Sequence, residues 1–99
     1  MATYLELFAL RSNSDLQDKI AVAVAKKAQA LLDGETPTTA AVAWAQEAIQ
    51  NPKTKADALI NYVLVKNSEM TTAQIVAASD AVIQTQVDTA VDVLISGGA

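Results

Sequence analysis

Residues 14–34, SDLQDKIAVAVAKKAQALLDG, constrain the fold more than any other stretch, because they carry helix signals at both ends. Ser14 is a preferred N-cap residue, and Gln17 three residues later completes a capping box. Gly34 can adopt the left-handed backbone conformation that ends many helices. The sequence therefore predicts one long helix from Ser14 to about Gly34.

The apolar side of this predicted helix is wider than one core contact requires. At about 100° per residue, one face holds Leu16, Ile20, Ala23, Val24, Ala28 and Leu31. Four further residues widen it, namely Ala21, Ala25, Ala30 and Leu32. The resulting arc covers roughly 220°, against the ~100° stripe that packs on a single core. We therefore expect a second protein surface to cover part of this helix.

The composition indicates a single all-α domain, a compact bundle of five to six short helices over residues 1–99. The chain has 20 alanines but only three glycines and two prolines, which favours helix over β-turns. A hydrophobic fraction of 52% with 18% charged residues is too apolar for a disordered chain. No apolar run approaches the ~18 residues of a membrane span, so no membrane association is expected. The segment before the first apolar residues lacks the basic start of a signal peptide.

The first predicted helix is short. Thr3 and Glu6 form a capping box that opens it, and it ends near Arg11. Two interpretations of residues 1–11 remain open. The helix either docks on its own bundle or reaches as an arm onto a neighbouring subunit, because short apolar terminal segments are ordered only when something holds them.

Further cap signals divide the rest of the chain. A helix is predicted to start with Thr36 as its cap and Pro37 at its first position, and to end near Gln50. Asn51-Pro52 has the same cap-plus-proline pattern and predicts the start of the next helix. Two helices are predicted after Asn67–Glu69. The first is short and opens with a capping box of Thr71 and Gln74. The second runs from Asp80 to about Ser96 and has Ser79 as its cap. One continuous helix from Thr72 is the alternative. Residues 97–99 are expected to fray.

Helical periodicity assigns the larger apolar residues to two groups. The predicted core anchors are Leu16, Ile20, Val24, Leu31, Trp44, Leu59, Val63, Val87 and Leu94. The lone Trp44 lies beside alanines that let another helix approach, so a core position is favoured over a ligand-stacking role. The candidate interface residues are Tyr4, Leu7 and Phe8 on the terminal helix, Val22, Val82 and Val93 away from the predicted core faces, and Lys27 on the wide apolar arc.

Lys27 is unusual because it lies on the apolar arc of the long helix. Two interpretations remain open. Its aliphatic stem packs while the ammonium reaches solvent, or it pairs with a carboxylate across a subunit interface, since an unpaired buried charge is costly.

Little in the sequence predicts catalysis or cofactor binding. Histidine and cysteine are absent, which removes the usual general base near neutral pH and any thiolate chemistry. Asp88 and Asp92, one helical turn apart, could present oxygens to a divalent cation, but no motif supplies further ligands. We therefore expect no catalytic residue, metal or cofactor, and a solvated acidic edge at these positions. The net charge of −4 also argues against a nucleic-acid-binding domain.

The order of several short features is similar to that of small tailed-bacteriophage virion proteins. These features are the start Tyr4-Leu5-Glu6-Leu7-Phe8-Ala9-Leu10, then Ala43-Trp44-Ala45 and Asn51-Pro52, and finally Ser79-Asp80, Ile83-Gln84, Val87-Asp88 and Val91-Asp92. The likeness runs along most of the chain and consists of helix caps and alanines rather than a catalytic signature. All-helical connector adaptors of about this length resemble it as well.

The resemblance implies a structural role: a ring-forming homo-oligomer at the head-to-tail junction of the virion, assembled in the host cytoplasm. Its neighbours would be portal or tail proteins, and DNA would pass through its lumen without sequence-specific binding. An acidic balance suits such a channel, because like charge keeps DNA from the wall. A head-decoration or tail protein is the first alternative. A small helical regulator that binds another protein is the alternative from a different class.

Overall fold

The computed structural model describes residues 2–96, and within this range the chain is all-α, as predicted. The helices are α1 (Tyr4–Leu10), α2 (Ser14–Leu32), α3 (Thr39–Gln50), α4 (Pro52–Lys66), α5 (Thr72–Val76) and α6 (Asp80–Ile95). Because α5 and α6 are separate helices, the prediction of two helices after residue 70 is confirmed, and the alternative of one continuous helix from Thr72 is wrong. The predicted fraying of residues 97–99 lies outside the described residues.

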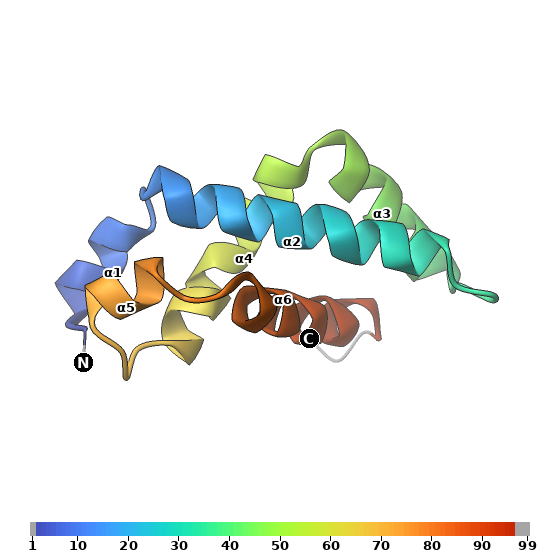
Figure 1. The fold of residues 1–99 in the computed structure, drawn as a ribbon. Helices are drawn as coiled ribbons and strands as arrows, with labels where there is room; N and C mark the ends of the chain where they lie inside the picture. The colour runs from blue at the N-terminus through green and yellow to red at the C-terminus, as the bar shows by residue number, and fades with distance from the viewer. Residues whose placement is uncertain (1, 97–99) are drawn as a thin grey trace.

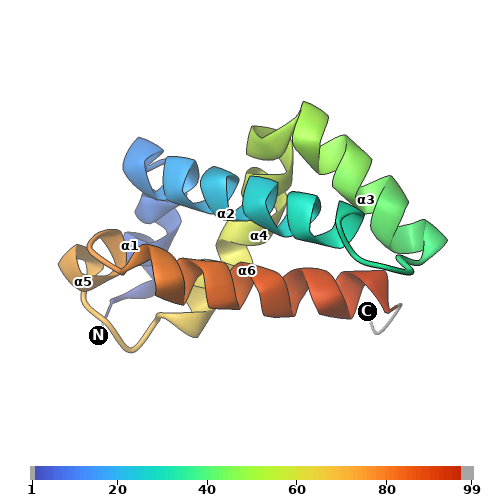
Figure 2. The same ribbon diagram turned by 45° about the vertical axis from the view of Figure 1, so that its right-hand side comes forward.

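The long helix α2 is the element on which the others are arranged. It packs against α3, α4 and α6, while α1 and α5 lie together beside its beginning (Figure 1). The molecule is elongated, with extents of 41 × 24 × 20 Å. Figure 2 shows α1 and α5 at one end of the long dimension and the last turn of α6 toward the other.

Hydrogen-bonded caps set three of the six described helix starts where the sequence places them. Thr3 with Glu6, and Thr71 with Gln74, form complete capping boxes, and Ser79 caps α6. Pro52 is the first residue of α4, as predicted, although Asn51 makes no side-chain cap bond.

Three of the predicted end signals are wrong. Asn13 caps α2 in place of Ser14, because its side-chain oxygen accepts the Leu16 N–H at 2.9 Å. Thr38 replaces Thr36 as the cap of α3 and accepts the Ala41 N–H at 3.1 Å, so Pro37 precedes the helix. Gly34 does not adopt the left-handed conformation.

The end of α2 and the start of α3 show why these predictions failed. The last turn of α2 closes on Asp33, whose right-handed backbone (φ −81°, ψ −8°) lets its N–H bond to the Gln29 carbonyl. The helix therefore needs no glycine to stop. Ser, Thr and Asn all cap well, so neighbouring candidates compete and local geometry chooses between them.

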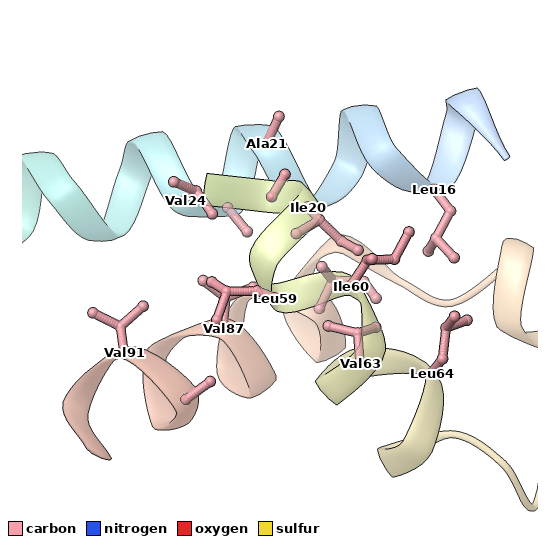
Figure 3. Packing of buried hydrophobic residues seen from close by; sticks show 14 of the residues in the cluster. Leu16, Ile20, Ala21, Val24, Leu59, Ile60, Val63, Leu64, Val87 and Val91 are labelled. Carbon is pink, nitrogen blue, oxygen red and sulfur yellow. The ribbon is translucent and has the colours of Figure 1, made fainter. Parts of the chain in front are cut away.

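The core forms where α2, α4 and α6 meet (Figure 3). The predicted anchors that are buried there are Leu16, Ile20, Val24, Leu59, Val63 and Val87. Leu31 and Trp44 are only partly buried and pack against the core from its edge. Leu94 is not a core residue, since it is 50% exposed. It continues the buried stripe of Val87 and Val91, but it lies in the last turn of α6, where less of the bundle covers it.

One polar pair lies within this apolar packing. Asn67, which is 2% exposed, follows α4 and exchanges two hydrogen bonds of 3.0 Å with the side-chain amide of Gln86 on α6. The Asn67 amide also donates to the Val63 carbonyl at 2.8 Å. Buried amides are tolerated only when they are paired in this way. The pair therefore fixes the end of α4 against α6.

A lysine also ties α2 to the connection between α5 and α6. The ammonium of Lys19 donates to the carbonyls of Val76 and Ala78, both at 3.0 Å. These carbonyls lie where α5 ends and the chain turns into α6. A cation at the end of a helix satisfies its free carbonyls and complements its dipole.

The corner between α3 and α4 is bridged by an ion pair. The Lys55 ammonium donates to the Glu47 carboxylate at 2.7 Å. This hydrogen bond, with the positive charge of Lys55, lowers the pKa of Glu47 below its ordinary value. The pKa of Glu47 is therefore lower in the folded chain than in the unfolded chain. The ion pair stabilises the fold at pH values above the unfolded-state pKa of Glu47, and this stabilisation is lost as the pH falls through the folded-state pKa.

We expect Lys55→Met to return the pKa of Glu47 to its ordinary value, because the substitution removes both the hydrogen bond and the charge. NMR titration of the Glu47 side-chain carboxyl measures this directly. Lys53→Met is the matched control, since Lys53 pairs with Asp18 at 3.8 Å instead. An unchanged Glu47 pKa in Lys55→Met would contradict the assignment.

Candidate protein-binding surfaces

A groove lies between α1 and α4. It has a volume of about 300 Å³ and is lined by Tyr4, Leu7, Phe8, Arg11, Asn61, Leu64 and Val65. Leu64 is buried at its floor, Leu7 is partly buried, and the other apolar residues stand at its rim. Arg11 is the one charged residue of this lining.

Four large apolar side chains of α1 and α4 are exposed, and all but Leu5 line this groove. They are Tyr4 (82%), Leu5 (79%), Phe8 (69%) and Val65 (68%), and we call them the α1 patch. Exposed apolar residues are ordinary when scattered singly, but a group of this size is typical of an interaction site. Tyr4 and Phe8 belong to the predicted interface set, and the structure places them together with Leu7 around one groove.

The α1 helix is docked on its own bundle, which is the first of the two interpretations of residues 1–11. The Ala2 N–H bonds to the carbonyls of Met70 at 2.8 Å and Ser68 at 3.2 Å, and Ala2 is buried. Leu10 is buried as well. The docking holds α1 in place and leaves the α1 patch facing outward.

An ion pair fixes the far end of the groove. Arg11 Nη2 contacts both carboxylate oxygens of Asp57 on α4 at 3.3 Å. The two side chains are 41% and 59% exposed, so the pair contributes little stability. It holds the guanidinium at the rim of the groove, where Asp57 offsets its charge.

A second exposed apolar site lies at the end of α6. Val93 is 46% exposed and Leu94 is 50% exposed, and we call these two residues the distal tip. Val93 was predicted as an interface residue, whereas Leu94 was assigned to the core. Figure 2 places this end of α6 away from α1, across the long dimension of the molecule.

The remaining predicted interface residues do not join either site. Val82 is 40% exposed and lines a cavity of about 420 Å³ beside α5, about three turns from Val93 along α6. Val22 is 55% exposed on α2. The structure therefore divides the predicted set: the residues of α1 lie together, and the three valines lie apart.

Lys27 forms its ion pair within the chain. Its ammonium lies 2.7 Å from the Asp92 carboxylate on α6, and the Lys27 side chain is only 14% exposed against 64% for Asp92. The stem is therefore buried, as in the first interpretation, and the ammonium meets an exposed carboxylate of the same chain. This pair neutralises the Lys27 charge without a subunit interface.

We expect Lys27→Met to lower the free energy of unfolding by less than about 1 kcal/mol, since partly exposed ion pairs contribute little. Lys27→Ala should cost more, because it also removes the packed stem. Urea unfolding of both variants measures the difference, with Lys26→Met as the control on the exposed neighbour. If Lys27→Ala behaved like Lys26→Met, the buried stem would have no structural role.

Asp88 and Asp92 are engaged by different partners. Asp88 accepts a hydrogen bond from Gln84 at 2.9 Å, and Gln84 also donates to the Ala23 carbonyl on α2. Asp92 pairs with Lys27. Across residues 2–96, no three acidic, histidine or cysteine side chains are close enough to share a metal ion.

Sequence reasoning missed Leu5, Val65 and Leu94 as exposed apolar residues. The signal for Val65 was present, because it lies opposite the buried stripe of Leu59, Ile60 and Val63 on α4. Leu94 gave no such signal, since periodicity places it on the core face.

No protein-family model, curated protein or solved structure matches the chain. The described helices also include none with the length and hydropathy needed to cross a membrane. The surfaces described above are therefore the basis on which a function can be proposed.

Proposed function

We propose that this protein is a structural subunit of a larger protein assembly, and that the assembly is the head-to-tail connector ring of a tailed bacteriophage. The observation that carries the first part is the α1 patch. Four large apolar side chains, each at least 68% exposed, lie at one end of a small helical bundle, and three of them, Tyr4, Phe8 and Val65, line a groove. Burying them against another chain would be strongly favourable, because each aromatic side chain can bury about 150–250 Å².

The second part of the proposal is supported by the sequence resemblance to small virion proteins and by the charge of the chain. A net charge of −4 is compatible with a ring through which DNA passes, since like charge keeps DNA from binding the wall. In this role the protein binds portal or tail components and copies of itself, and performs no chemistry.

Mass spectrometry of purified phage particles tests this proposal. The chain should be present in particles in multiple copies, and should remain in the portal-containing fraction after heads and tails are separated. Recovery with head shells alone would indicate a decoration protein, and recovery with tails alone would indicate a tail component. Absence from particles, with binding to a different protein, would contradict a virion role and indicate a regulator.

The α1 patch provides a sharper test. Phe8→Glu places a charge in the patch without changing the core, so particles assembled with this variant should contain much less of it than of the native chain. Val22→Glu is the matched control, because it adds the same charge at an exposed valine on α2. Equal incorporation of both variants would show that the patch does not take part in assembly.

A further inference from the structure

We infer that Asp33-Gly34, in the connection between α2 and α3, is a site of spontaneous covalent modification at which the aspartate rearranges to isoaspartate. The reaction uses only atoms of these two residues and water, so it does not depend on the proposed function. Its product is a backbone that runs through the Asp33 side chain and carries a free α-carboxylate. Isoaspartyl methyltransferases recognise that group, so the aged chain is a substrate for this class of enzyme.

The rearrangement has two steps. In the first, the backbone nitrogen of Gly34 bonds to Cγ of Asp33, and one carboxyl oxygen leaves as water with the amide proton and the carboxyl proton. In the second, water adds to the resulting cyclic imide at the Asp33 backbone carbonyl, and the bond from that carbonyl to the Gly34 nitrogen breaks. One water is lost and one is gained, so the mass of the chain is unchanged and nothing is oxidised or reduced.

The first requirement of this reaction is access to the carboxyl group. Residues 33–38 are exposed along their whole length, at the end of α2 opposite α1 (Figure 1). The Asp33 carboxylate accepts a hydrogen bond from Gln29 Nε2 at 3.0 Å, and both side chains are exposed. Water exchanges readily with such a bond, because its net contribution to stability is small. The carboxyl group is therefore free to react.

The second requirement is a backbone nitrogen that can leave its hydrogen bond. The Gly34 N–H donates to the Leu31 carbonyl at 3.4 Å, which is longer than the about 2.7–3.2 Å of an ordinary N–H···O bond. The N–H of Asp33 is held more closely, at 3.0 Å from the Gln29 carbonyl. The last turn of α2 thus closes firmly on Asp33 and only loosely on Gly34, which leaves the attacking nitrogen available.

The third requirement is conformational freedom at the attacked bond. Gly34 has no Cβ, so its backbone can rotate toward the ring geometry without a steric penalty. Every other aspartate is followed by a residue with a side chain and lies within a helix. These are Asp15 and Asp18 in α2, Asp57 in α4, and Asp80, Asp88 and Asp92 in α6. Helical hydrogen bonds fix the backbone at those positions, so the reaction is confined to Asp33.

Incubation of the full chain in water enriched in oxygen-18 tests the inference, because ring opening places a heavy oxygen in each chain that has reacted. Trypsin then releases residues 28–53, in which Asp33 is the only aspartate. The asparagine of this peptide, Asn51, cannot form the ring, because the following Pro52 has no N–H. Mass spectrometry should show label in this peptide that increases with time. An isoaspartyl methyltransferase should methylate the aged chain and not the fresh one.

Gly34→Ala is the matched control. The structure accommodates it, since an added Cβ would lie 3.4 Å from the Leu31 carbonyl oxygen, which is an ordinary contact. Labelling of residues 28–53 should be at least about tenfold slower in this variant. Asp33→Glu keeps the charge and should abolish the labelling, because its longer side chain would have to close a larger ring. Circular dichroism establishes that both variants are folded.

Three results would overturn the inference. The first is a native chain whose residues 28–53 take up no label, and the second is Gly34→Ala labelled at the native rate. The third is equal labelling of residues 56–66, whose Asp57 lies within α4, because it would show that the Asp33-Gly34 connection is not special.

Discussion

Ile20→Ala should lower the free energy of unfolding by about 2–5 kcal/mol, the range for removing a large aliphatic side chain from a packed core. Ile20 is fully buried on α2, among the side chains that meet those of α4 (Figure 3). Domains of this size are stable by only about 5–15 kcal/mol, so the variant loses a large share of its stability.

Urea unfolding followed by circular dichroism measures this change. Val22→Ala is the control on the same helix, because Val22 is 55% exposed and its truncation should change stability by no more than about 0.5 kcal/mol. Similar losses for both variants would mean that α2 is not packed as described.

Near neutral pH, Asn67→Asp should lower the free energy of unfolding about as much as Ile20→Ala, because it places a carboxylate at a site that is 2% exposed. The aspartate cannot donate to the Val63 carbonyl or to the Gln86 side-chain oxygen, which Asn67 now does. A buried charge without sufficient partners costs several kcal/mol, so we expect a loss of about 3 kcal/mol or more at pH 7.

The pH dependence of this variant provides the sharper measurement. Burial should raise the pKa of the introduced carboxyl, so relative to the native chain its stability is higher at low pH and is lost as pH rises through that pKa. The comparison is made by urea unfolding at about pH 4 and about pH 7, either side of a raised carboxyl pKa. Asn67→Leu combined with Gln86→Leu is the control, because removing both partners of a buried pair is far less costly than leaving one unpaired. A loss independent of pH would contradict the buried position.

The fold was largely predictable because helix signals are local. Capping boxes at Thr3 and Thr71 involve residues three apart, and the 3.6-residue period of apolar side chains marks the faces that pack. These signals gave the all-α class, and six of the nine predicted core anchors are buried. They failed at Leu94, because periodicity identifies the face of a helix and does not show where the covering helices end.

The candidate surfaces were less predictable because they depend on contacts between distant segments. The groove joins α1 to α4, more than 40 residues away in the chain. The partner of Lys27 is Asp92, and no local pattern links the two. Lys19 of α2 likewise binds carbonyls at the end of α5, and no local pattern links these two segments.

The hydrogen bonds of Ala2 to Ser68 and Met70 also set an order of folding. Ala2 docks on carbonyls that lie more than 60 residues later in the chain and therefore leave the ribosome after it. Closing so large a loop is slow compared with forming local helices, so α1 should be the last helix of this region to dock. Until then Tyr4, Leu5 and Phe8 remain exposed on an undocked segment, where contacts between nascent chains are most damaging. The end of the molecule that is proposed to bind a neighbour is thus completed only after residues 68–70 have been made.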